Sequence, residues 1–289
     1  MLFQAKRPAF HHLKQKWTAK HRSLQDKVWD KHGTSLRQLA VGSLGGLMLL
    51  ASPTSAAITN QHSTGDQITQ DTDNNMLLAD EISKKLPQEM RSLNSQEETE
   101  IGQILSRNFG FKVSAELQNI RLNRSYGVIG GEQHLYRYPG DSLQKHADTS
   151  VDWAMFGSSG IAPGLGAWGY FVPSEAEFSE KDKMREKYYL ATQTFLAPGF
   201  AENVGKYRDF FKFRKMLVVN PKTGQSVVAV IGDAGPAEWT GKHLGGSPEV
   251  MHFLGLAGGP RKGPVLYFFV DDPIDQIPLG PIKLDKFRS

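Results

Sequence analysis

The chain has 289 residues, a formal net charge of +4 and no cysteine. This length suffices for one large domain or two modest ones with real cores. The absence of cysteine excludes disulfides, a thiol nucleophile, cysteine-ligated zinc and a lipidated N-terminal cysteine.

The positive charge is concentrated at the N-terminus. Residues 1–38 contain nine Lys or Arg and two Asp, a surplus of seven, and residues 39–57 are uncharged. Without residues 1–57 the net charge is therefore 4 − 7 = −3. This distribution argues against a nucleic-acid partner, because the body of the protein is not basic.

The first 57 residues have the pattern of an export signal. An apolar stretch over 39–51 follows the basic segment, and Ser55 and Ala57 place small side chains at a plausible cleavage site. About 20 apolar residues are needed to span a bilayer, so this run is short for an anchor. We predict that 1–57 is a signal peptide or N-terminal anchor and the sole contact with the membrane, which places the body outside the cytoplasm, in the cell envelope or secreted.

Two segments separate the leader from the C-terminal part. Residues 58–94 are predicted to form a flexible tether, because 58–75 are polar with almost nothing to bury. Residues 95–163 form an accessory region with a helix that starts at Ser95, where Glu98 has capping-box spacing. The same region contains a predicted β-hairpin over 126–138, with its turn at Gly130-Gly131.

From residue 164 the chain reads as short strands separated by turn residues. A helix is expected to begin at Ser247 with Pro248 in its first turn. Phe210, Phe211 and Phe213 alternate with basic residues and favour a strand with one buried face. The strand candidates are 165–172, 188–196, 214–220, 226–232 and 264–270. The pattern predicts a mainly β fold with a small closed barrel in the domain 164–289.

The segment Met216–Pro236 suggests a family. It reads as a hairpin with an Asn220–Gly224 turn that runs into Asp233-Ala234-Gly235-Pro236, followed by a short helix and a final strand. This order resembles the double-psi β-barrel of the rare lipoprotein A and expansin-like group, over roughly residues 164–272. Residues 166–171 resemble that family's first strand. The resemblance implies a six-stranded double-psi barrel with one short helix, preceded by the helix and hairpin region.

The family resemblance also implies a function. In that family the barrel groove binds glycan, and members cleave or loosen cell-wall polysaccharide, which in bacteria is peptidoglycan. Active members use an Asp just before the helix, where this chain has Gly245-Gly246-Ser247, and a histidine in the region that Ala191–Thr194 occupies here. Asp233 is the one active residue that carries over.

The candidate catalytic residues are Asp233, Glu238 and His243. A lytic transglycosylase needs one carboxyl that acts as acid and then as base, and Asp233 could also simply bond its own turn. Glu238 and His243 lie within ten residues of it and could supply a second group. The candidate sugar-binding residues are Trp239, Trp168 and Tyr170.

No metal and no cofactor is expected. His243 and His252 lack metal-ligand spacing on one helix face, and no His-Glu-x-x-His run exists. Three hypotheses stay open: a peptidoglycan cleaver of the lytic transglycosylase type, a non-catalytic glycan-binding module with a degenerate barrel site, and a structural envelope protein with a protein partner. Whether the protein is an enzyme is left undecided at this level.

Overall fold

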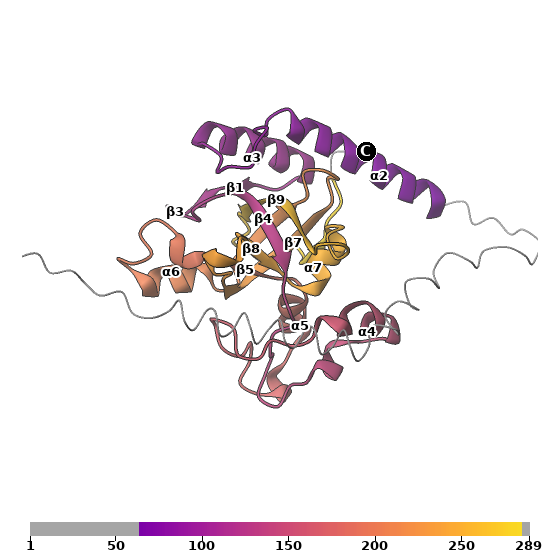
Figure 1. The fold of residues 1–289 in the computed structure, drawn as a ribbon, viewed down its shortest axis with the longest axis vertical. Coiled ribbons are helices and arrows are strands. Elements are labelled where there is room, and N and C mark those ends of the chain that lie inside the picture. Colours follow the sequence, from indigo (N-terminus) through magenta and orange to yellow (C-terminus); the bar gives the residue numbers. More distant parts are fainter. Residues whose placement is uncertain (1–63, 285–289) are drawn as a thin grey trace, which may run out of the picture. The chain divides into compact units, whose positions relative to one another are not determined.

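Figure 1 shows a computed structural model of the chain, which describes residues 64–284. The predicted leader over 1–57 lies outside these residues. No helix in the described part is long and apolar enough to cross a membrane. The helices are α2 Thr64–Ser83, α3 Ser95–Phe109, α4 Ser150–Phe156, α5 Glu180–Lys187, α6 Val204–Phe211 and α7 Pro248–Phe253. The strands are β1 Val113–Ser114, β2 Glu116–Leu117, β3 Ile120–Arg121, β4 Tyr126–Gly131, β5 Tyr189–Thr192, β6 Lys215–Val219, β7 Ser226–Ala234, β8 Leu244–Gly246, β9 Lys262–Val270 and β10 Gly280–Pro281.

Six strands close into a mixed barrel in the order β4, β9, β6, β7, β5, β8 and back to β4. The pairs β4–β8 and β5–β7 are parallel, and the other four are antiparallel. Two short strands extend the sheet, β1 beside β9 and β10 beside β7, and β2 with β3 forms a separate small hairpin. The predicted mainly β fold with a small closed barrel is confirmed.

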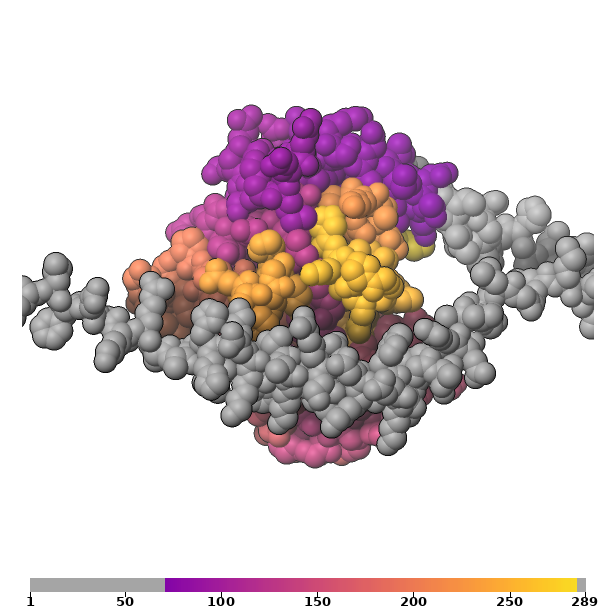
Figure 2. All heavy atoms as spheres, in the orientation of Figure 1, coloured from indigo at the N-terminus to yellow at the C-terminus, as the bar shows by residue number. Residues whose placement is uncertain are grey.

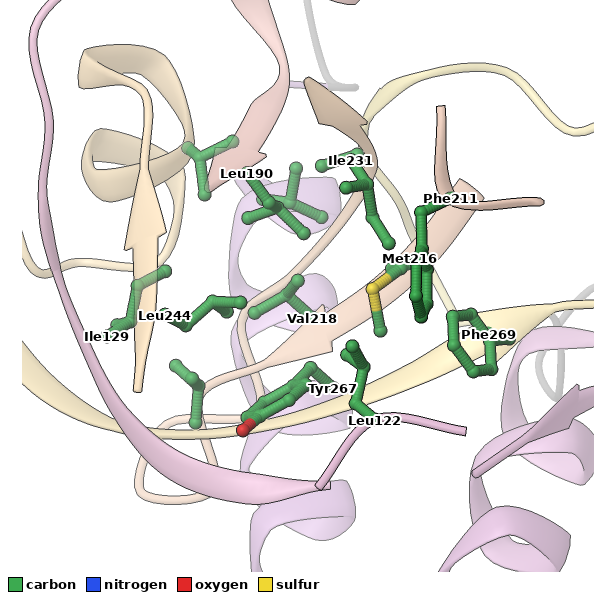
Figure 3. Packing of buried hydrophobic residues seen from close by; sticks show 14 of the residues in the cluster. Leu122, Ile129, Leu190, Phe211, Met216, Val218, Ile231, Leu244, Tyr267 and Phe269 are labelled. Atoms are coloured by element: carbon green, nitrogen blue, oxygen red, sulfur yellow. The ribbon is translucent and has the colours of Figure 1, made fainter. Parts of the chain in front are cut away.

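The barrel interior is apolar because side chains alternate along its strands. On β6, Met216 and Val218 belong to the interior cluster, together with Ile129, Leu190 and Phe269 from other strands. Figure 3 shows these side chains converging inside the barrel. The strand sequences are almost continuously apolar because their other face is covered as well.

The outer face of β6, β7 and β9 packs against the pair α2–α3. Leu217, Val219 and Phe268 share a second cluster with Ile101 and Leu105 of α3. Figure 1 shows the two helices lying across one side of the barrel, and in Figure 2 their indigo atoms form a layer over it. The helix predicted from Ser95 is therefore present. Its N-cap is Asn94, in a capping box with Glu97, one residue before the predicted cap.

The predicted turn at Asn220–Gly224 joins β6 and β7 as expected. Gly224 adopts φ +72°, and a Cβ on it would lie 1.9 Å from the carbonyl oxygen of Asn75 in α2. A glycine is required there by both its conformation and its close approach to the helix. Residues 64–83 of the predicted tether form α2, which continues past this contact.

Two predicted strands and one predicted turn are wrong. Residues 165–172 contain no strand, and the first barrel strand is β4, which was predicted to be half of a hairpin in the accessory region. The turn expected at Gly130-Gly131 is absent, because both residues are paired with β8. Phe210 and Phe211 lie on α6, since Val204, Tyr207 and Phe211 recur with helical period. The barrel therefore begins at Tyr126 rather than at 164.

Residues 132–187 form an insertion between β4 and β5, which contains α4 and α5 and the short 3-10 helix Leu143–His146. Figure 1 shows this insertion on the side of the barrel opposite α2 and α3. Its buried residues are unusual for a core, because Arg137, Asp141, His146 and Glu186 are each at most 7% exposed. The insertion is thus held partly by charged groups.

Candidate functional site

A row of four residues crosses the outer face of the barrel and ends at Asp233. Gly130 pairs with Gly245, Gly245 pairs with Ala191, and Ala191 pairs with Asp233. Directly paired residues point to the same face of a sheet. The neighbours Ile129, Leu244 and Leu190 point into the barrel, so the row faces outward.

Asp233 lies at the end of β7, beside a bulge where the register shifts between Leu190 and Ala191. Its Oδ1 accepts two backbone N–H groups, from Ala167 at 2.6 Å and from Ala234 at 2.7 Å. Burial raises the pKa of Asp233, and these two hydrogen bonds oppose the rise only in part. Its Oδ2 has no hydrogen-bond partner among residues 71–284. Asp233 thus combines a raised pKa with one uncommitted oxygen, as a proton donor requires.

A second carboxylate lies on the same row. The Glu132 side chain, which follows β4, passes over Gly245, where a Cβ would lie 2.4 Å from Glu132 Oε1. Lys242 passes over Gly130 in the same way, and its Nζ lies 2.5 Å from Glu132 Oε1. The two glycines therefore make room for this ion pair. Gly245 and Asp233 are two strand spacings apart, about 9.5 Å.

The loop after Asp233 carries two of the predicted residues, Glu238 and Trp239. Gln193 holds this loop, because its Nε2 donates to the carbonyls of Pro236 at 3.1 Å and Lys242 at 3.3 Å. The Trp239 side chain is 89% exposed, and Glu238 is exposed as well. Neither forms a hydrogen bond or ion pair with Asp233.

Trp168 lies close to the Asp233 region, and Tyr170 lies farther along the same loop. Trp168 Nε1 donates to the carbonyl of Ile231 at 3.2 Å, and the guanidinium of Arg208 lies 5.8 Å from its ring centre. Because Ala167 next to it bonds Asp233, the loop that contains Trp168 lies against the carboxyl. Tyr170 is 37% exposed.

His243 faces away from this row. Its ring packs on Gly127, which pairs with Val265 of the barrel interior. Its Nδ1 accepts the backbone N–H of Val128 at 3.0 Å, and Arg124 Nη1 lies 2.8 Å from Nε2. Burial lowers the pKa of His243, and the charge of Arg124 lowers it further. The structure therefore does not bring His243 to Asp233.

The lowered pKa of His243 predicts acid sensitivity. The unfolded chain binds the proton from pH 6.5 downward, whereas the folded chain binds it only at lower pH. The free energy of unfolding should therefore fall as pH drops through 6.5. We expect this fall to be smaller in His243→Gln than in the wild type, measured by urea denaturation at a series of pH values. Equal slopes in both proteins would contradict the lowered pKa.

A second constellation lies inside the 132–187 insertion. Arg137 donates to both oxygens of Asp141, from Nε at 2.9 Å and from Nη2 at 2.8 Å. Asp141 Oδ2 lies 2.9 Å from Nε2 of His146, whose Nδ1 lies 3.1 Å from Glu186. The other oxygen of Glu186 lies 3.3 Å from Nδ1 of His134 and accepts the Leu135 N–H at 3.1 Å. One continuous chain of polar contacts thus links four short segments.

The contacts in this polar network shift the pKa values of its members strongly. Burial alone would lower the pKa of His146, but its hydrogen bonds to Asp141 and Glu186 outweigh burial and raise the pKa to about 9. Burial would raise the pKa of Glu186, yet the two histidines lower it to about 2. With no other cation bound, His146 is therefore protonated between two ionised carboxylates.

The sequence predictions missed Glu132 and this buried constellation. A Glu after Gly130-Gly131 carries no motif, and its place over Gly245 depends on the pairing of β4 with β8. Glu186 is 52 residues from His134 and 40 from His146, so no local spacing marks the group.

No protein-family model matches the chain, and no curated protein matches it.

Proposed function

We propose that the protein is exported to the cell envelope, where its barrel binds the glycan strands of peptidoglycan and cleaves them with Asp233 as the general acid. The observation that carries this proposal is the outward-facing row, which presents Asp233 and the Glu132 carboxylate on one face of the barrel. Two carboxyl groups that flank a glycosidic bond are the usual catalytic arrangement for its cleavage.

The barrel topology supports the double-psi assignment within this proposal. Two parallel pairs, β4–β8 and β5–β7, lie among antiparallel neighbours in a closed six-strand barrel. Asp233 lies near the end of β7, in one parallel pair, and α7 follows β8, in the other pair, as the resemblance to the rare lipoprotein A and expansin-like group requires.

In this proposal, Glu132 takes the place of a carboxylate that active family members have and this chain lacks. Active members of that group carry an Asp just before the helix, where this chain has Gly245. The space above Gly245 is filled by the Glu132 side chain from the adjacent strand. The second carboxylate would thus come from β4 instead of β8, and Lys242 would hold it in place.

The chemistry assigns different roles to the two groups. Asp233, whose pKa is raised by burial, is the group assigned to give a proton to the leaving oxygen. Glu132 would then act on the opposite side, either as a base for water or by stabilising positive charge on the sugar. The exposed ring of Trp239, on the loop that Gln193 holds, offers an apolar surface for a sugar to stack on.

Export rests on the leader over 1–57, with its basic segment, 13 apolar residues and small residues at 55 and 57. The −3 charge of the remainder fits a protein without a nucleic-acid partner. These features support export to the compartment where peptidoglycan is found.

A second candidate function is glycan binding without cleavage. The observation in its favour is that Asp233 Oδ1 is bonded to Ala167 and Ala234 N–H groups, as in a carboxylate that only fixes a loop. A third, purely structural role with a protein partner in the envelope would require neither binding nor cleavage of sacculi.

The test is a sacculus assay with the full chain, which records both co-sedimentation and the release of soluble muropeptides. We expect Asp233→Asn to reduce release by about 10²–10⁴-fold, the usual contribution of a general acid, while co-sedimentation persists. Glu238→Gln is the matched control, because this exposed carboxyl lies on the following loop and should leave release unchanged.

Two other outcomes of the sacculus assay would support the other candidate functions. Co-sedimentation without release by the wild type would identify a glycan-binding module. A chain that neither binds nor releases would leave the structural role and remove the glycan proposal.

A further inference from the structure

The strongest unassigned feature is the cluster of His134, His146 and Glu186 in the 132–187 insertion. One ligand atom from each lies within 4.8 Å of the others. The three residues are 2%, 5% and 1% exposed, respectively, and they come from three different segments. They are two imidazoles and a carboxylate, a ligand set that zinc takes in proteins.

Two ligand-to-ligand distances in the cluster suit a common ion. Nδ1 of His134 and Nδ1 of His146 lie 3.3 Å and 3.1 Å from the two oxygens of Glu186. Ligands at the usual zinc–nitrogen and zinc–oxygen distances in a tetrahedral site are separated by about 3.3 Å. A cavity of about 10 Å³ adjoins both histidines on a side that Glu186 does not line, and it is about the size of one water molecule.

The surroundings orient one ligand as metal sites usually do. His146 directs Nδ1 to the cluster, and its Nε2 lies 2.9 Å from Asp141 Oδ2. Asp141 is in turn held by two hydrogen bonds from the Arg137 side chain. A carboxylate that accepts the other N–H of a ligating histidine fixes both its tautomer and its ring orientation.

An independent observation comes from Glu249 on α7. Its side chain is 97% buried (3% exposed), and its Oε2 has no hydrogen-bond partner within the described residues. It lies close enough to His134 and Glu186 to interact with both electrostatically. A buried carboxylate oxygen without a partner is costly, and a nearby cation would satisfy it.

The charges also balance with a divalent ion. Arg137 neutralises Asp141, and two neutral histidines add nothing, so Glu186 leaves one negative charge to be compensated, and Glu249 adds a second when it is ionised. We propose that His134, His146 and Glu186 bind one Zn²⁺ ion, with Glu249 completing its surroundings. The site is closed, so the ion is structural and fastens the insertion. The alternative is a metal-free network in which a proton on His146 supplies the positive charge.

A bound ion that holds the 132–187 insertion in place would also affect Asp233. The insertion includes Ala167, whose N–H donates to Asp233, and His134 forms a bridge with Ile161 shortly before it. The metal would thus help to hold the loop that lies against Asp233. Zinc binding itself depends on this cluster and the residues that support it, not on Asp233, and is therefore independent of the proposed function.

The test uses the purified full chain, stripped with a chelator and titrated with ZnCl₂. We expect one equivalent of zinc per chain by calorimetry and by elemental analysis after dialysis, and a Tm that rises with zinc. His146→Gln and Glu186→Gln should lose the bound zinc. His243→Gln and His252→Gln, outside the cluster, should retain it. Asp141→Asn should weaken binding about 10–100-fold.

A spectroscopic arm needs no variant. The wild-type chain loaded with Co²⁺ should show the strong visible absorption of a four-coordinate site, which decides the question even where a ligand variant fails to fold. The proposal would be overturned in favour of the metal-free network by any of three results. These are a wild type that retains no zinc, a His146→Gln variant that retains as much zinc as the wild type, and a Co²⁺-loaded protein with only the weak absorption of hydrated Co²⁺.

Discussion

Arg137→Leu is expected to lower the free energy of unfolding by about 3–5 kcal/mol. Arg137 is 3% exposed, and its guanidinium donates to both oxygens of Asp141, whose side chain is fully buried. Removing the cation leaves that carboxylate buried with only His146 as a charged partner. Loss of one member of a buried ion pair costs far more than the intact pair contributes, because the remaining charge stays desolvated.

Urea denaturation followed by circular dichroism measures this effect. Lys84→Met is the matched control: it also removes one member of an i,i+4 ion pair, but Lys84 and Asp80 are 68% and 62% exposed. We expect the control to change stability by at most about 1 kcal/mol. A similarly small change in Arg137→Leu would mean that the insertion does not depend on its buried charges.

Phe268→Ala should destabilise the protein by about 3–5 kcal/mol. Phe268 is fully buried on β9, in the cluster between the barrel and the pair α2–α3. Its ring lies against Gly102 of α3, where a Cβ would be 3.8 Å from Phe268 Cε1. Truncation therefore leaves a cavity that the strand and the helix cannot both close.

Trp239→Ala is the control for this prediction, because that larger side chain is 89% exposed. We expect it to change stability by no more than about 0.5 kcal/mol. Chemical denaturation of both variants compares the two effects. If Phe268→Ala were equally mild, α2 and α3 would not be packed on the barrel as described.

Elements with strong local signals could be predicted from the sequence. The turn Asn220–Gly224 between two apolar runs predicts the β6–β7 hairpin, and Ser247 with Pro248 predicts α7. Local chemistry decides these elements, since the turn and the cap each use residues suited to one backbone conformation. The position of Asp233 near a strand end could be predicted for the same reason, because it belongs to a short motif there.

Elements that depend on distant partners were mispredicted. Gly130 and Gly131 look like a turn, yet they continue β4 because β8, more than 100 residues away, pairs with them. Residues 165–172 have a strand-like composition, but they pair with no strand among the described residues and form a loop beside Asp233. Strand pairing of this kind is set by tertiary contacts rather than by the segment itself.

The relations between residues of the candidate site also depend on distant strand pairing. Glu132 could not be connected with Asp233 from the sequence, because the connection runs through Gly245 and Ala191 on two intervening strands. His243 is near Asp233 in sequence, but it directly precedes β8 and its ring packs against Gly127, away from the row that ends at Asp233. Nearness along the chain was a poor guide to nearness in the fold.

The most direct test of the central claim is muropeptide release by the wild type, Glu132→Gln, Asp233→Asn and the double variant. If the two carboxylates act as one unit across the outer row, each single change removes most of the release and the double variant is hardly worse than Asp233→Asn. Full release by Glu132→Gln, or losses that simply multiply in the double variant, would contradict the claim that the two groups work together.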